Sequence, residues 1–186
     1  MPLNPYLISL YLPFEAAPHF RPTHNHIFLC GGVGEWMYRS LGGIAPASPG
    51  YAAVKIAPQI SKTLDPASAN ATVSTVRGVV KSSWTRHSTG DELASCTDGR
   101  SPLVTMAVSV PVGMLGDVHI PLLGRDPAAV VVEETRVGGT LRVWAGGAVD
   151  ATVSAVWLQK LPRVEGGSLV LETGAAELEL ATFERC

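Results

Sequence analysis

Short segments in which apolar and polar residues alternate run from residue 51 to the C-terminus, separated by glycine and proline. In the segment 103–110, for example, Val104, Met106, Val108 and Val110 occupy every second position. Successive side chains of a strand point to opposite faces, so this period of two predicts strands with one buried face. Paired glycines at 138–139, 146–147 and 166–167 lie between such segments, as hairpin connectors do. A series of short strands of this kind is typical of an antiparallel β-sandwich.

We expect the strands at defined positions. Gly78 is expected to be a turn or bulge within the second of these segments. The strand segments are 51–57, 72–84, 103–110, 117–122, 130–134, 140–144, 153–158, 168–172 and 176–183. The fold class that follows is mainly β, a jelly-roll-like antiparallel sandwich.

One amphipathic helix is expected before the first strand, over residues 32–42. Glu35 and Arg39 lie one turn apart in the favourable acid-before-base order, and we expect them to form an ion pair. Gly42–Gly43 is expected to end the helix, and the proline-rich segment 45–50 to form a turn. The large apolar residues have the i, i+3, i+4, i+8 spacing of one helical face: Val33, Trp36, Met37 and Leu41. We therefore expect Trp36 to be a core anchor.

Composition limits the classes of function. The 186 residues are 46% apolar and 16% charged, which favours a packed core over disorder. A formal net charge of −2 without a basic block argues against nucleic acid as a partner. Without a run of about 20 apolar residues, we expect a soluble chain that does not span a membrane. Cys30, Cys96 and Cys186 predict free or buried thiols, because their odd number and wide spacing define no disulfide or zinc pattern.

Residues 1–23 are apolar and interrupted by prolines, and no basic region precedes them. A cleaved signal peptide is therefore the less favoured interpretation. The apolar, proline-interrupted pattern fits better with a segment that packs against the core, or with a gene model that begins at the wrong position. The sequence assigns no compartment.

Residues 24–58 carry several motifs in a fixed order. They are Asn25-His26, Gly-Val-Gly-Glu-Trp-Met-Tyr-Arg at 32–39, Gly-Ile at 43–44, Pro-Gly at 49–50 and Ile-Ala-Pro at 56–58. This stretch resembles the end of the catalytic domain of bacterial-type α-L-rhamnosidases, and the resemblance continues more loosely from 78–84 to the C-terminus. In that family the last helices of a six-hairpin α-toroid lead into a C-terminal β-sandwich. The resemblance implies that residues 1–48, including helix 32–42, are the end of the helical domain, and that 49–186 are the sandwich domain.

The resemblance also implies a sugar-contacting residue. In the family, the His of the Asn-His pair lies in the sugar pocket and hydrogen-bonds rhamnose, which places His26 as a substrate-binding residue with Asn25 beside it. An imidazole offers one donor and one acceptor to neighbouring hydroxyls. The alternative is a polar residue at the domain junction that binds no ligand.

No catalytic residue is assigned. Inverting hydrolysis needs two carboxyl groups, one that protonates the leaving oxygen and one that activates water. Glu15 precedes the Asn-His pair, but the family's base lies at a longer spacing and beside a Trp, and its general acid lies further upstream. Whether this chain is an enzyme is therefore uncertain, and we expect no glycosidase turnover from these residues alone.

Metal and cofactor chemistry are not expected. His19, His24 and His26 lack a Cys or carboxylate partner at a familiar interval, so metal binding is the less favoured interpretation. Gly31–Gly34 lacks the Lys-Ser/Thr ending of a phosphate loop. The sequence also shows no nucleophile motif.

Three hypotheses follow. The first is the C-terminal part of an α-L-rhamnosidase-like glycoside hydrolase, whose partners would be a rhamnose-containing glycoside and the missing catalytic domain or a self-association partner. The second is a stand-alone carbohydrate-binding sandwich, and the third is a truncated gene product without a function of its own. Trp84, Trp144 and Trp157 discriminate between the first two, because exposed indoles favour carbohydrate binding and buried ones count against it.

Overall fold

The computed structural model describes residues 27–63, 65–87, 99–136, 139–150 and 157–185. The chain divides into two units, Met1–Gly34 and Glu35–Cys186, which are treated separately below. In the first unit the described residues form most of helix α2 (Ile27–Trp36). All strands among the described residues belong to the second unit.

The expected helix is present with different bounds. Helix α2 begins at Ile27, before the predicted residue 32, and one turn of π-helix, η2 (Met37–Leu41), follows it directly. The expected ion pair joins Arg39 Nε to Glu35 Oε1 at 3.1 Å.

The expectation that Trp36 is a core anchor is wrong. Trp36, Met37 and Tyr38 are each about half exposed, at 51%, 51% and 49%. The helical spacing of the apolar residues predicted a buried face, but spacing does not show whether another surface covers that face.

The double glycine ends the helical segment as predicted. The Gly42 N–H donates to the Met37 carbonyl oxygen at 2.8 Å, and Gly43 has a φ of 73°. A Cβ at Gly43 would lie 2.2 Å from the backbone nitrogen of Pro58, so both the backbone angle and the space require glycine.

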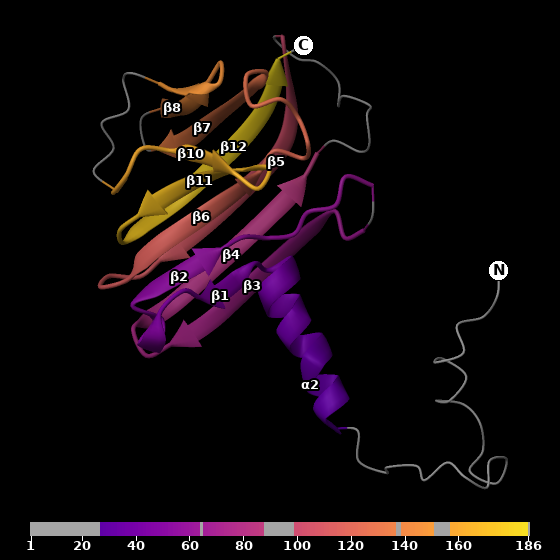
Figure 1. Cartoon of the computed structure of the whole chain (residues 1–186), viewed down its shortest axis with the longest axis vertical. Helices are drawn as coiled ribbons and strands as arrows, with labels where there is room; N and C mark the ends of the chain where they lie inside the picture. Colours follow the sequence, from indigo (N-terminus) through magenta and orange to yellow (C-terminus); the bar gives the residue numbers. More distant parts are fainter. Residues whose placement is uncertain (1–26, 64, 88–98, 137–138, 151–156, 186) are drawn as a thin grey trace, which may run out of the picture. The chain divides into compact units, whose positions relative to one another are not determined.

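The second unit contains two stacked sheets (Figure 1). The five-stranded sheet has, in spatial order, β1 (Ile44–Pro46), β2 (Ala53–Ile56), β6 (Leu115–Pro121), β11 (Ser168–Thr173) and β10 (Arg163–Glu165). The seven-stranded sheet has β3 (Ser68–Thr75), β4 (Gly78–Arg86), β5 (Arg100–Val110), β12 (Ala176–Arg185), β7 (Val130–Arg136), β8 (Gly139–Ala145) and β9 (Ala148–Val149).

The core lies between the sheets, because each sheet turns one apolar face inward. Val54, Ile56 and Val118 contribute from the five-stranded sheet, and Val80 and Leu178 from the seven-stranded sheet, each at most 1% exposed. Most pairings are antiparallel, so the predicted β-sandwich is confirmed. The exception is β2, which pairs with β6 in parallel.

The segment 45–50, predicted as a turn, holds the end of strand β1 and only then turns through a 3₁₀ helix, η3 (Pro49–Tyr51). Proline was the reason for predicting a turn, but Pro46 lies on an edge strand, where a missing N–H costs no pairing. Strand β1 thus precedes residue 49, where we placed the start of the sandwich domain; that domain division stays a prediction.

Three further expectations fall wholly or mainly outside the described residues. Most of the predicted strand 153–158 lies there, as do Cys96 and Cys186.

Within the part of the chain that the structure describes, no helix is long and apolar enough to span a bilayer.

Candidate functional site

The sequence-predicted site residues His26 and Asn25 lie outside the described residues, and so do Glu15, His19 and His24. The substrate-binding role of His26 and Asn25 therefore stays a prediction. The described residues of the second unit offer a different candidate site.

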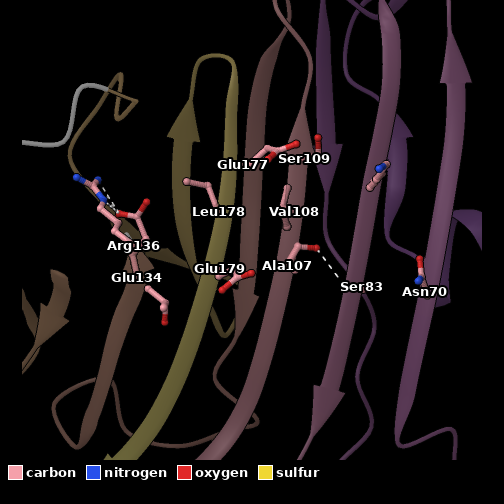
Figure 2. Close-up of a pocket in the computed structure, with 12 residues that line it drawn as sticks. Asn70, Ser83, Ala107, Val108, Ser109, Glu134, Arg136, Glu177, Leu178 and Glu179 are labelled. Carbon is pink, nitrogen blue, oxygen red and sulfur yellow. Dashed lines mark hydrogen bonds and ion pairs between the residues drawn. The ribbon is translucent and has the colours of Figure 1, made fainter. Parts of the chain in front are cut away.

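A groove of about 760 Å³ crosses the outer face of the seven-stranded sheet (Figure 2). Its volume falls within the range of roughly 300–1,000 Å³ that is usual for ligand sites. It is lined by Asn70, Lys81, Ser83, Ala107, Val108, Ser109, Glu134, Thr135, Arg136, Glu177, Leu178 and Glu179.

Strand register brings the polar lining residues together in rows. One row consists of Asn70, Ser83, Ala107, Glu179 and Thr135, each opposite the next across strands β3, β4, β5, β12 and β7. The row crosses four strand spacings of about 4.8 Å, or about 19 Å in total.

A second row lies one pleat away and joins Lys81, Ser109 and Glu177. These positions alternate along β4 with the buried residues Val80, Ser82 and Trp84. The two rows therefore face outward, away from the core.

The floor of the groove is made by a small residue. Ala107 lies between Ser83 and Glu179, and its methyl group leaves the centre of the row low. The Ser83 hydroxyl donates to the Ala107 carbonyl oxygen at 3.4 Å, which leaves the Ser83 oxygen free to accept (Figure 2). Among the described residues, no aromatic side chain lines this groove; its polar groups are hydroxyl, amide, carboxylate, ammonium and guanidinium groups.

Glu134 and Arg136 border the groove from the other side of β7. Glu134 is opposite Leu180, a core residue, and is only 3% exposed. Its Oε2 accepts from Arg136 Nε at 2.8 Å and from Trp157 Nε1 at 3.0 Å. Because a buried carboxylate needs such partners, we interpret these contacts as a structural network that holds Trp157 against the sheet.

A charged cluster occupies the outer face of the five-stranded sheet. Glu172 lies 2.7 Å from both Lys160 Nζ and Arg163 NH1, and Asp117 lies 3.1 Å from His119 Nε2. Hydrogen bonding from Lys160, opposed by desolvation and reinforced by Arg163, lowers the pKa of the Glu172 carboxyl. Glu172 is therefore ionised at neutral pH and unsuited to donate a proton. No group of three or more metal-ligating side chains exists among the residues described here.

The tryptophans form no exposed platform on the sheets. Trp84 is 2% exposed and donates to the Leu41 carbonyl oxygen at 2.7 Å; Trp144 is 6% exposed and donates to that of Pro127 at 3.0 Å. Trp157 is half-buried against the core. This arrangement favours packing over sugar stacking for these three residues.

Sequence analysis did not identify the groove. It placed Lys81 and Ser83 in the predicted strand 72–84, and Glu177 and Glu179 in the predicted strand 176–183, without assigning their side chains to a face. Their meeting in one groove depends on the register between β4, β5 and β12, which local patterns do not encode.

Comparisons with known proteins agree with the fold. The sequence model of the family described as bacterial alpha-L-rhamnosidase C-terminal domain matches residues 43–136. An α-L-rhamnosidase of Formosa agariphila is 31% identical over 134 residues, which cover 70% of this chain and 13% of that protein. One of Streptomyces avermitilis is 34% identical over 99 residues, which cover 53% of this chain and 8% of that protein. The chain thus spans only a small part of the length of these curated relatives.

Two solved structures are similar. The structure of an α-L-rhamnosidase from Dictyoglumus thermophilum covers 83% of this chain with a TM-score of 0.57 and 21% identity, and the match covers 14% of that structure. The Streptomyces avermitilis α-L-rhamnosidase complexed with L-rhamnose covers 82% of this chain with a TM-score of 0.50 and 26% identity, and the match covers 11% of that structure.

Proposed function

Because this chain belongs to the family of bacterial α-L-rhamnosidase C-terminal domains, we propose that it acts as the C-terminal β-sandwich module of an α-L-rhamnosidase-type glycoside hydrolase. The observation that carries the proposal is the family match over residues 43–136, which includes strands β1 to β7. In the intact enzyme the module would support a helical catalytic domain and would not itself cleave the substrate.

The exposed helical residues support such a partner. Trp36, Met37 and Tyr38 are consecutive and each about half exposed, and we call them the helical patch. Consecutive helical residues point about 100° apart, so these side chains surround much of the helix. Several large apolar side chains exposed close together are typical of a contact surface. A helical domain that precedes the sandwich would cover them.

The described carboxylates give no reason to expect catalysis. The less exposed glutamates lie in ion pairs with basic groups: Glu133 with Arg100, Glu134 with Arg136, Glu172 with Lys160 and Glu184 with Arg125. Glu177 and Glu179 share a face of β12 in the groove, but both are exposed. A general acid of a glycosidase is usually buried beside apolar groups, whereas Glu177 and Glu179 are not buried.

The test is hydrolysis of an aryl α-L-rhamnoside by the purified chain, with an intact rhamnosidase as the positive control. We expect no release of the aryl alcohol above the uncatalysed rate. Turnover that Glu15→Gln abolishes would show that the chain carries its own catalytic carboxylate and would overturn this part of the proposal.

His26, with Asn25 beside it, is proposed as a rhamnose contact in the intact enzyme. The support is the Asn-His motif alone, since the family match begins at residue 43. A hybrid enzyme in which this chain replaces the matching segment of the Formosa agariphila relative provides the test. Loss of one or two hydrogen bonds in His26→Ala should raise KM for the aryl rhamnoside about tenfold. An unchanged KM and kcat would show that His26 is a polar residue at the domain junction that does not bind the substrate.

A further inference from the structure

We infer that the groove on the outer face of the seven-stranded sheet binds a neutral oligosaccharide chain. The choice of a rhamnose-containing sugar as the probe rests on the proposed function, whereas the groove itself rests on the structure. Nothing in the comparisons assigns a ligand to this face.

The first argument is the chemistry of the lining. Asn70, Ser83 and Ser109 offer hydroxyl and amide groups that can both donate and accept hydrogen bonds. Glu177 and Glu179 offer carboxylates, each of which can accept from two neighbouring hydroxyls, and Lys81 offers donors at the β4 side. Such a mixture suits a ligand whose surface consists of hydroxyl groups.

The second argument is shape and rigidity. The groove runs across five hydrogen-bonded strands over about 19 Å, long enough for several sugar rings. Ala107 keeps the floor low at its centre. Since the lining lies on the inner strands β4, β5 and β12, its polar groups are positioned before a ligand arrives, which reduces the entropy lost on binding.

Other ligand classes fit less well. The lining contains three carboxylates and two basic groups, Lys81 and Arg136. Because Arg136 is paired with Glu134, the remaining lining charge is negative and disfavours an anionic polymer. A peptide that adds as a strand needs a free sheet edge, and β4, β5 and β12 are paired on both sides. Because the described lining of the groove contains no aromatic side chain, we expect binding in the millimolar range.

The experiment is an NMR titration of the ¹⁵N-labelled full chain with an α-linked L-rhamnose trisaccharide. Shifts should concentrate on the backbone amides of Ser83, Ala107, Ser109 and Glu179 and on the side-chain amide of Asn70. They should persist at high salt, because hydrogen bonds to hydroxyls depend little on screening. The absence of shifts at these positions overturns the inference.

Two variants and one control sharpen the test. Ala107→Leu fills the floor of the groove and should weaken binding at least about tenfold, while Glu179→Gln should weaken it about threefold. Ser68→Leu, at an exposed position on β3 of the same sheet, should leave affinity unchanged. Since Glu179→Gln changes one exposed group, it keeps the test valid if Ala107→Leu disturbs the fold.

Three further results would overturn the inference. The first is binding that survives both groove variants, and the second is chemical-shift changes that fall on the charged cluster around Glu172. The third is stronger, salt-sensitive binding of trilysine, which would identify a cationic peptide as the ligand. None of these results affects the domain proposal, which depends on hydrolysis and on the stability of a hybrid enzyme.

Discussion

At Gly43 the helical segment turns into the first strand, and both the φ of 73° and the 2.2 Å approach to Pro58 exclude a side chain. We expect Gly43→Ala to lower the free energy of unfolding by about 3 kcal/mol, since backbone strain and overlap add. Denaturant unfolding followed by circular dichroism measures it.

Gly113→Ala is the matched control. Gly113 also has a positive φ, 81°, but a Cβ there meets open space. This substitution should lower the free energy of unfolding by only about 1 kcal/mol. Equal losses in the two variants would show that the contact with Pro58 is not restrictive.

For single residues, the sequence predicted features that depend on local conformation. It did not predict burial, which depends on the other segments that pack against a residue. The Gly42–Gly43 stop and the Glu35–Arg39 pair follow from residue type and spacing, and the structure contains both. The burial of Trp84 and the exposure of Trp36 do not follow from spacing, because both lie in strongly periodic segments. Trp84 and Trp36 differ in whether another part of the protein packs against the side chain.

Among the elements, β6, β10 and β11 carry a cluster whose charges respond to pH. The folded state holds the pKa of Glu172 below its ordinary value through Lys160 and Arg163. A lowered pKa in the folded state contributes stability above the ordinary pKa of a glutamate, and this stability is lost as the pH falls through the folded value. Acidification below about pH 4.5 should therefore destabilise the protein partly through this residue.

Glu172→Gln tests this contribution. We expect a slightly lower Tm at pH 7 and a shallower fall of Tm between neutral and acidic pH than in the unaltered chain. Glu35→Gln, which removes one member of an exposed pair, is the control and should leave the slope unchanged. An identical acid slope in Glu172→Gln and the unaltered chain would contradict the assignment.

The positions of the strands were easier to predict from the sequence than the pairing between strands. Period-two alternation located β5, β7, β8, β11 and β12 closely. It missed β10, whose three residues are all exposed and show no alternation in burial. The parallel pairing of β2 with β6 depends on a contact between segments about sixty residues apart, and no local pattern signals it.

For the molecule as a whole, the fold class could be predicted because two independent signals agree: alternation gives the sandwich, and the motifs of 24–58 give the family. The groove could not be predicted, because it arises from five strands in register. The sequence placed Trp36 and Met37 of the helical patch on one helical face but not Tyr38, and the exposure of all three became evident only from the structure.

The central claim is that this chain supports a helical catalytic domain through the helical patch. The most direct measurement is the heat-inactivation half-life of the hybrid enzyme, followed by aryl α-L-rhamnoside hydrolysis. The reference is the Formosa agariphila relative without its matching segment. Trp36→Ser with Met37→Ser disrupts the patch, and Val112→Ser, at an 86% exposed turn residue, is the control.

We predict that the heat-inactivation half-life of the hybrid is about tenfold longer than that of the truncated enzyme, or more. A tenfold difference corresponds to about 1.4 kcal/mol in the free-energy barrier to inactivation. The double variant should lose most of that gain and the control should keep it. A hybrid no more stable than the truncated enzyme, or a double variant that behaves like the control, would contradict the account.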